Sequence, residues 1–210
     1  MRNLLLLAII AISMGLVGGC NNKQTSGVDN EELVNENTHF AAEQYSLMID
    51  EIDDSETIKN PKSFIDGKST FIPPRDWTSG FFPGSLWYIY ELTGDDKWKP
   101  YAIKYTEALD TIQYFTGNHD VGFMIYCSYG NGYRLTGTKE YEDVIINAAK
   151  SLSTRYIPEA GIIQSWGANP SRDWECPVII DNMMNLELLF NATKLSGDST
   201  FYHIAVTHAD

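Results

Sequence analysis

Asp181 stands at the head of a nearly continuous apolar run, PVIIDNMMNLELLF, which extends from Pro177 to Phe190. An ionised carboxylate removed from water is unfavourable unless it is paired or takes up a proton. Asp181 therefore either caps the helix that the run predicts or is held there for chemistry. The same question arises at two other places, where polar residues again precede an apolar helix.

Three junctions between a loop and an apolar helix carry residues that acid–base or binding chemistry uses. They are RDWTSGFFPGSLW with Trp77, NHDVGFM with His119 and Asp120, and DWECPVIIDNMMN with Asp181. If the three helices run parallel, their N-terminal ends meet at one mouth of the fold. We then expect the two aspartates to face each other across a cleft, with Trp77 and Trp166 as its walls.

Structural roles are open for the same residues. Asp120 and Asp181 belong to the residue types that cap helices best, and His119 can be a hydrogen-bonded packing residue. Asp181 and Asn185 are i, i+4 partners on one helical face, so a polar stripe is expected along an otherwise apolar helix. The neighbouring apolar residues are predicted to be core: Met183, Met184, Leu186, Leu188 and Leu189.

Two carboxylates across a sugar-sized cleft suggest general acid–base catalysis on a glycoside. The apolar neighbours Ile179, Ile180 and Met184 are expected to favour the protonated form of the Asp181 carboxyl group. A nearby Asp120 would act in the same direction by like-charge repulsion, and the pair would titrate together. The residues alone do not select the bond that is attacked.

A metal or cofactor is not expected. The chain has no CxxC, HExxH or clustered Cys/His pattern, and these are the spacings that metal sites use.

The net charge of −13 argues against nucleic acid as a partner of the chain. Cys127 and Cys176 have no framework spacing, so two buried free thiols are predicted.

An internal repeat predicts the architecture. YELTGDDKWKPYAIKYTEAL, YRLTGTKEYEDVIINAAKSL and TKLSGDSTFYHIAVTHAD share Leu-[Thr/Ser]-Gly, an aromatic residue four positions later and a small or apolar residue four further on. Each segment is therefore expected to be a corner at which one helix ends on a left-handed glycine and the next begins. The three sets are Gly94, Trp98 and Ala102; Gly137, Tyr141 and Ile145; and Gly197, Phe201 and Ala205.

The helix before each corner is apolar all round, and the helix after it is amphipathic. Alternating inner and outer helices at repeat spacing predict an all-α toroid. The gap between the second and third corners holds a Gly/Pro-rich loop, YIPEAGIIQSWGANPSRDWECP, which is expected to carry function. Three hairpins do not close a ring, and the sequence stops inside an amphipathic helix. We therefore expect the chain to be the N-terminal part of a longer protein.

The N-terminal segment is predicted to direct export. Residues 1–19 read as a signal peptide with Arg2 before a short apolar stretch, and LVGGC then ends at Cys20. This pattern resembles a bacterial lipoprotein box, which implies cleavage before Cys20 and a lipid on its sulfur. Residues 20–37 are expected to form a flexible tether and residues 38–210 the domain. The predicted location is the cell envelope, at the outer membrane or in the periplasm, with the lipid as the membrane contact.

The chain also resembles a known family. DWTSGFFPGSLW, HDVGFM, IQSWG and RDWECPVIIDNMMNLELL, in this order, resemble the unsaturated glucuronyl hydrolases, glycoside hydrolase family 88. The likeness covers about residues 38–210. It implies an (α/α)6 barrel, of which this chain is roughly the N-terminal half.

The resemblance implies a reaction and assigns residues to it. The family hydrates the C4=C5 bond of an unsaturated uronic acid at the non-reducing end of lyase products, and the resulting hemiketal opens and releases the sugar. By resemblance, Asp181 is the general acid that protonates C4, and Asp120 is a second catalytic carboxylate. His119, Trp77 and Trp166 match substrate-binding positions. Glycosaminoglycan fragments are the expected substrates, and the 210-residue piece alone is expected to be inactive.

Other functions remain open. A related family acts on unsaturated rhamnogalacturonan fragments with a similar barrel. A non-catalytic glycan-binding lipoprotein would need Trp77 and Trp166 but would tolerate Asp181→Asn. An endoglucanase on an α/α toroid would cut saturated chains instead.

Overall fold

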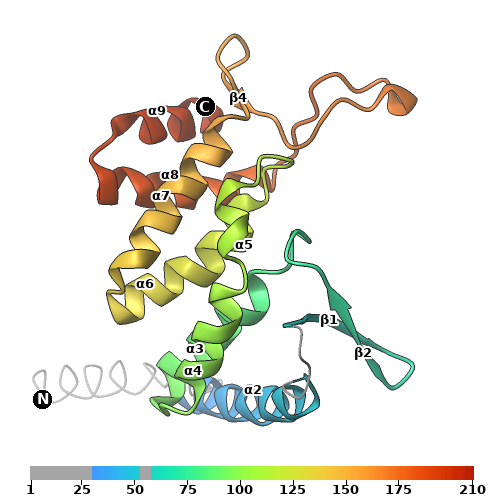
Figure 1. The fold of residues 1–210 in the computed structure, drawn as a ribbon, viewed down its shortest axis with the longest axis vertical. Helices are drawn as coiled ribbons and strands as arrows, with labels where there is room; N and C mark the ends of the chain where they lie inside the picture. Colours follow the sequence, from blue (N-terminus) through green and yellow to red (C-terminus); the bar gives the residue numbers. More distant parts are fainter. Residues whose placement is uncertain (1–29, 53–57) are drawn as a thin grey trace, which may run out of the picture. The chain divides into compact units, whose positions relative to one another are not determined.

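The computed structural model describes residues 30–52 and 58–210, which are mostly helical (Figure 1). The helices are α2 (Asn30–Ile52), α3 (Phe81–Thr93), α4 (Trp98–Glu107), α5 (Val121–Ile125), α6 (Asn131–Thr136), α7 (Lys139–Ser153), α8 (Asn182–Ser196) and α9 (Ser199–Ala209). A π-helical turn, η2 (Tyr126–Gly130), joins α5 to α6, and the 3-10 helices are η1 (Asp110–Tyr114) and η3 (Pro170–Arg172). Two antiparallel strand pairs occur in the described residues: β1 (Asn60–Ile65) with β2 (Lys68–Ile72), and β3 (Tyr156–Ile157) with β4 (Ile162–Ile163).

The predicted helix–turn–helix corners are all present. The helices α3, α6 and α8 end at glycines in the left-handed region, with φ of 64° at Gly94, 68° at Gly137 and 75° at Gly197. Each glycine N–H donates to the carbonyl four residues earlier, as a helix C-cap requires. The residues predicted to start the next helices are buried: Trp98, Ala102, Tyr141, Ile145, Phe201 and Ala205.

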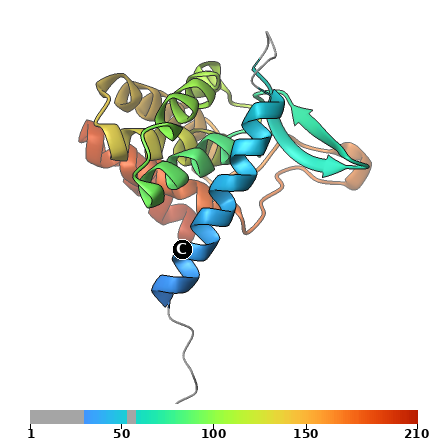
Figure 2. The ribbon, with the colours of Figure 1, turned by 90° about the horizontal axis from the view of Figure 1, so that it is seen from below.

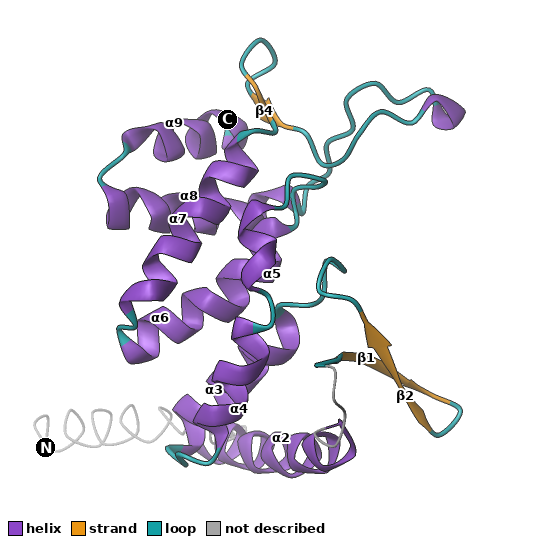
Figure 3. Cartoon of the chain, viewed as in Figure 1, coloured by secondary structure: helices purple, strands orange, loops and turns teal. Residues whose placement is uncertain are grey.

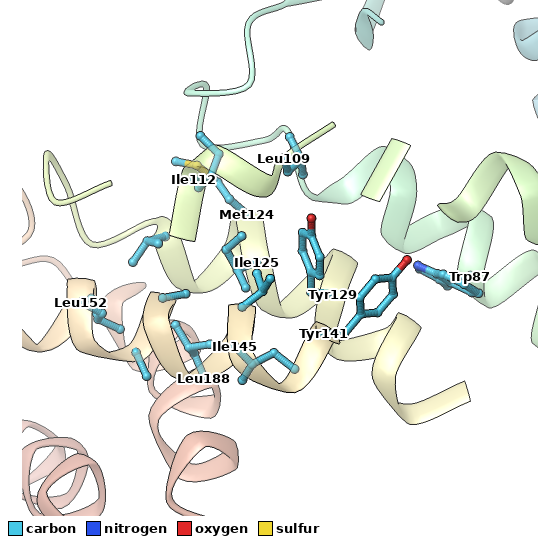
Figure 4. Packing of buried hydrophobic residues seen from close by; sticks show 14 of the residues in the cluster. Trp87, Leu109, Ile112, Met124, Ile125, Tyr129, Tyr141, Ile145, Leu152 and Leu188 are labelled. Atoms are coloured by element: carbon cyan, nitrogen blue, oxygen red, sulfur yellow. The ribbon is translucent and has the colours of Figure 1, made fainter. Parts of the chain in front are cut away.

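The core lies where these helices pack on one another. α3 packs on α4, α7 on α8 and α8 on α9, while α5 contacts both α7 and α8. Figure 4 shows the buried cluster that results, in which Met124, Ile125, Ile145 and Leu188 are fully buried. The buried residues of α7 recur at helical spacing on one face, which confirms that this helix is amphipathic.

The first helix of the second hairpin contains the π-helical turn. Residues 121–136 form one continuous helical run in which η2 separates α5 from α6. The Asn131 side chain donates to the Cys127 carbonyl over 2.9 Å, which satisfies a carbonyl of that turn. Such a turn adds residues without ending the helix. Residues 121–136 therefore act as a single first helix of this hairpin, which begins at α5 and ends at the Gly137 corner.

Two non-helical segments leave the helices. The β1–β2 hairpin and the loop that carries η3 extend from the same side of the helical hairpins (Figures 1 and 2). The loop has little regular structure between β4 and α8 (Figure 3). It is the Gly/Pro-rich segment that the sequence marked for function, and it leads directly into Asp181.

Some sequence predictions are wrong. Met183 and Met184 are not core, because they are 41% and 67% exposed on the face of α8 opposite to its buried residues Asn182, Asn185 and Leu186. Cys127 and Cys176 are free, as predicted, but neither is buried as predicted: Cys127 is half-buried and Cys176 is exposed. Apolar Met183 and Met184 are exposed while polar Asn182 and Asn185 are buried on the other face of α8. The face on which a residue lies, and not its apolar character, therefore decides burial in this helix.

The domain boundaries and the anchor stay predictions. Residues 1–29, with the signal peptide and Cys20, lie outside the described residues. Residues 30–37, predicted to belong to the tether, are the first part of α2. Within the described ranges, no helix has both the length and the apolar character needed to cross a membrane.

Candidate active site

Asp120 and Asp181 occupy the N-cap positions of α5 and α8, and neither carboxylate caps its helix. Their backbone angles are already helical, with φ and ψ of −69° and −1° at Asp120 and −64° and −18° at Asp181. A capping residue is typically extended, so that its oxygen can reach the N–H groups of the first turn. The capping explanation is therefore wrong for both side chains.

The two carboxylates meet at the ring of His119. The His119 Nε2 atom lies 3.3 Å from Asp120 Oδ1 and 3.8 Å from Asp181 Oδ1. His119 is fully buried and Asp120 is 9% exposed, whereas the Asp181 side chain is 39% exposed. The two aspartates thus lie close together, as the sequence predicted, with His119 beside both. The predicted sugar-sized cleft between them stays a prediction.

His119 is not a hydrogen-bonded packing residue. Within the described part of the chain, neither Nδ1 nor Nε2 has a hydrogen-bond partner, and the buried Asp181 Oδ1 has none either. Buried polar atoms are nearly always paired in folded proteins. Unpaired atoms of this kind are available to a ligand, and they lie beside two carboxylates.

Ser165 joins the segments that carry these residues. Its carbonyl accepts from His119 N over 2.9 Å, its N–H donates to Pro177 O over 2.9 Å, and its Oγ accepts from Ile179 N over 3.1 Å. Ser165 is fully buried. It therefore fixes the approach to α5 and the approach to α8 relative to each other, although the two are about 60 residues apart in sequence.

Two asparagine side chains of α8 also fix the position of this helix relative to α5 and β4. Asn185 Oδ1 accepts from Phe123 N over 2.9 Å, and Asn182 Nδ2 donates to Ile163 O over 2.7 Å. A Cβ atom on Gly122 would lie 2.5 Å from Asn185 Oδ1, so only glycine allows α5 and α8 this close. The predicted polar stripe is present on α8, and Asn185, which is fully buried, uses it to bind α5.

The two predicted tryptophan walls differ in position. The Trp166 ring lies edge-on to His119, with 6.0 Å between ring centroids, and also contacts Trp174 at 6.2 Å. Trp77 contacts Phe123 at 6.1 Å and is 46% exposed. Trp166 thus borders the His119 cluster, whereas Trp77 contacts Phe123 of α5 and makes no ring contact with His119 in the described part of the chain.

The apolar neighbours of Asp181 do not enclose its carboxyl group. Ile179 is 39% exposed, Ile180 is 86% exposed and Met184 is 67% exposed. The expectation that these side chains favour the protonated form of Asp181 stays a prediction. The buried wall beside Asp181 is His119 instead.

Two further residues border the site and were not found from the sequence. Arg155 donates from Nε to Gln164 O over 2.7 Å and from Nη1 to Thr116 O over 2.6 Å. It thereby connects the segment just before His119 to the segment just before Ser165. His208 Nδ1 accepts from Ile163 N over 3.0 Å. Burial, and then the charge of the nearby His119 when it is protonated, lower the pKa of His208. No sequence motif marked either residue, because both act through contacts with distant backbone.

The chain is similar to several proteins of known name. It is 51% identical over 140 residues to an unsaturated glucuronyl hydrolase of Formosa agariphila, covering 66% of this chain and 35% of that protein. It superposes on the crystal structure of an unsaturated glucuronyl hydrolase specific for heparin with a TM-score of 0.78 and 44% identity, over 85% of this chain and 47% of the other. The chain is a homologue of the unsaturated glucuronyl hydrolases.

Other unsaturated glucuronyl hydrolases support this relationship. The Streptococcus agalactiae structure gives a TM-score of 0.75 at 29% identity, over 84% of this chain and 44% of that one. An unsaturated chondroitin disaccharide hydrolase of Streptococcus pneumoniae is 33% identical over 156 residues, or 73% of this chain and 39% of that protein. No protein-family model matches the chain.

The unsaturated glucuronyl hydrolase fold confirms the predicted fold class. The chain is mostly helical and matches part of an (α/α)6 barrel. It spans about a third to a half of the length of these relatives. The helices described above are therefore a section of that barrel.

Proposed function

We propose that the protein to which this chain belongs releases 4,5-unsaturated uronic acid from the non-reducing end of oligosaccharides that polysaccharide lyases produce. The homology supports this reaction class, while the activity of the whole protein rests on more residues than the chain contains. In this reaction, hydration of the C4=C5 vinyl ether gives a hemiketal at C5. The hemiketal opens and releases the remaining sugar.

One observation carries the proposal. Two carboxylates that do not cap their helices converge on one buried histidine, whose ring nitrogens have no hydrogen-bond partner in the described residues. A purely structural role would leave these atoms paired. General acid–base catalysis requires a carboxyl group that can reach both solvent and substrate, and Asp181 combines a buried Oδ1 with an exposed fraction of 39%.

Asp181 is the residue that we assign to proton transfer. Its carboxylic acid gives a proton to C4, and a water oxygen forms the new bond to C5. The carboxylate then takes the proton that this water loses, which restores the acid. Asp120 is more buried than Asp181 and assists from beside the same His119 nitrogen, and His119 is placed to hold the substrate next to both.

Glycosaminoglycan fragments are the proposed substrates. A solved relative that is 44% identical is described as specific for heparin, and a curated relative that is 33% identical is named for chondroitin disaccharides. Trp166 lies beside His119 and Trp174 lies beside Trp166, and both offer ring faces on which a sugar can stack. The same rings would serve a glycan-binding protein and do not distinguish it from an enzyme. Substitutions of the two carboxylates do, because only catalysis requires them.

The test follows the ultraviolet absorbance of the conjugated C4=C5 uronate. The full-length protein would be incubated with unsaturated disaccharides from heparin, chondroitin and rhamnogalacturonan. We expect the absorbance to decay on at least one glycosaminoglycan fragment, and to decay about 10²–10⁴-fold more slowly with Asp181→Asn or Asp120→Asn.

Asp198→Asn is the matched control, because it makes the same change at the start of α9. It is expected to turn over substrate at the wild-type rate. If the wild-type protein leaves the chromophore intact on every fragment but still binds them, the glycan-binding alternative replaces the hydrolase. Decay on rhamnogalacturonan fragments alone would move the protein to the other unsaturated-uronate family.

We also propose that the protein is a cell-envelope lipoprotein. The support is the sequence LVGGC after an apolar N-terminal stretch. Labelled fatty acid is expected to be incorporated into the wild-type protein and not into Cys20→Ala. Incorporation into both would contradict the anchor.

A further inference from the structure

The site also has the geometry of a cation site. His119 Nε2, one oxygen of Asp120 and one oxygen of Asp181 lie within 4.8 Å of one another. A tetrahedral zinc ion with nitrogen and oxygen ligands at 2.0–2.2 Å separates its ligands by about 3.3–3.6 Å. The His119–Asp120 distance of 3.3 Å falls in this range, and the His119–Asp181 distance of 3.8 Å needs only a small side-chain rotation.

The donor atoms are free to bind. In the part of the chain that the structure describes, His119 Nε2 and Asp181 Oδ1 have no hydrogen-bond partner, so a cation would break no existing bond. The histidine is fully buried and directed at the two carboxylates, while the exposed part of Asp181 leaves an entrance from solvent. One imidazole and two carboxylates are ligands that suit Zn²⁺.

We propose that this cluster binds one zinc-class divalent ion, and that the ion inhibits the enzyme. The inhibition rests on the proposed function, whereas binding of the ion does not. A bound ion takes up an oxygen of each carboxylate and displaces the proton that Asp181 would deliver to C4. It also occupies the nitrogen with which His119 faces the substrate.

The surroundings indicate a reversible inhibitor and not a resident cofactor. In high-affinity sites the second nitrogen of a ligand histidine donates to a carboxylate or carbonyl, and loss of that partner weakens binding about 10- to 100-fold. His119 Nδ1 has no such partner within the described residues. The ion should therefore bind and leave with changes in its free concentration.

The experiment measures binding and rate separately on chelator-treated full-length protein. Calorimetric titration with Zn²⁺ is expected to show one site, and His119→Gln or Asp181→Asn should weaken it at least about tenfold. Asp198→Asn should bind as the wild type does. Mg²⁺ should neither bind nor inhibit at equal concentration, because it prefers an octahedral set of oxygen ligands.

The outcomes separate the two proposals. Zinc binding that the His119 and Asp181 variants do not weaken, or no binding at all, would overturn the site. Loss of turnover after chelation, restored by Zn²⁺, would overturn inhibition in favour of a cofactor. Zinc binding that depends on these residues in a protein that turns over no unsaturated fragment would support the site and refute the proposed function.

Discussion

Asp181 and Asp198 begin the two helices of the same hairpin, and their carboxylates do opposite things. Asp198 has extended backbone angles, φ −79° and ψ 108°, and its Oδ1 accepts from Thr200 N over 2.9 Å. Asp181 has helical angles and makes no capping bond, and its Oδ1 faces His119 at 3.8 Å. Asp198 thus caps its own helix, whereas the Asp181 carboxylate makes no bond to the helix that it begins.

Short polar side chains accept backbone N–H groups in the turns before several helices. At the corners, local side chains accept backbone N–H groups: Asp95 Oδ1 from Lys97 N over 3.0 Å, and Thr136 Oγ1 from Thr138 N over 3.2 Å. The same kind of bond precedes two of the site helices: Asp76 Oδ1 accepts from Thr78 N before α3, and Asn118 Oδ1 accepts from Asp120 N before α5, each over 3.0 Å. The Asp181 carboxylate makes no such bond at the start of α8, and in this it differs from these side chains as it differs from Asp198.

The sharpest test of this comparison replaces each aspartate by alanine. Asp181→Ala is expected to slow uronate hydration by about 10²–10⁴-fold, because it removes the proposed proton donor, and to leave the thermal midpoint unchanged, because no capping bond is lost. Asp198→Ala should lower the midpoint and keep the rate. Absorbance assays and thermal melts of the full-length protein measure both. A clear loss of stability in Asp181→Ala would make that residue a structural one.

Gly122→Ala should affect stability and activity together. The new methyl group would press on Asn185, which overpacks the contact between α5 and α8 and should lower the free energy of unfolding by about 1–3 kcal/mol. The rate is expected to fall roughly 10- to 100-fold, because Asp120 and Asp181 would move apart. Gly167→Ala is the control, since its Cβ would meet no atom within 4 Å. A Gly122→Ala protein with wild-type rate would show that α5 and α8 need not be this close.

The corner glycines should affect stability alone. A side chain at Gly94 has open space, but the φ of 64° makes it unfavourable by about 1–2 kcal/mol. Gly94→Ala is therefore expected to lower the free energy of unfolding by that amount in denaturant titration, with no change in rate. A reduced rate would mean that the corner and the site are coupled.

The smallest expected effect is a pH dependence at Asp198. The Thr200 backbone N–H, and then its hydroxyl, hold the pKa of Asp198 below its usual value of 3.8. Because the folded-state pKa is the lower one, the stabilisation is fully present above about pH 3.8 and is lost as the pH falls through the folded-state pKa. The difference in thermal midpoint between wild type and Asp198→Ala should shrink in acid. A difference that stays constant with pH would contradict this contribution.

Much of the fold was predictable because the signals are local. A left-handed glycine followed by buried residues at helical spacing fixes each corner within about ten residues, and all three corners appear at the predicted positions. The convergence of Asp120 and Asp181 could be expected once the helices were taken as parallel. The roles of Ser165, Arg155 and His208 could not be predicted, because each acts on backbone atoms that are distant in sequence.

The sequence by itself determined the helices, their corners, the residues at the helix starts and the likeness to unsaturated glucuronyl hydrolases. Only the tertiary structure decided that Asp120 and Asp181 do not cap, that the ring nitrogens of His119 have no hydrogen-bond partner among the described residues, and that Met183 and Met184 are exposed. The physical reason is that a capping bond and a buried surface depend on where a side chain points, which is set by packing between helices. Residue type and spacing give the candidates, and the contacts between α5, α8 and the loop before α8 assign their roles.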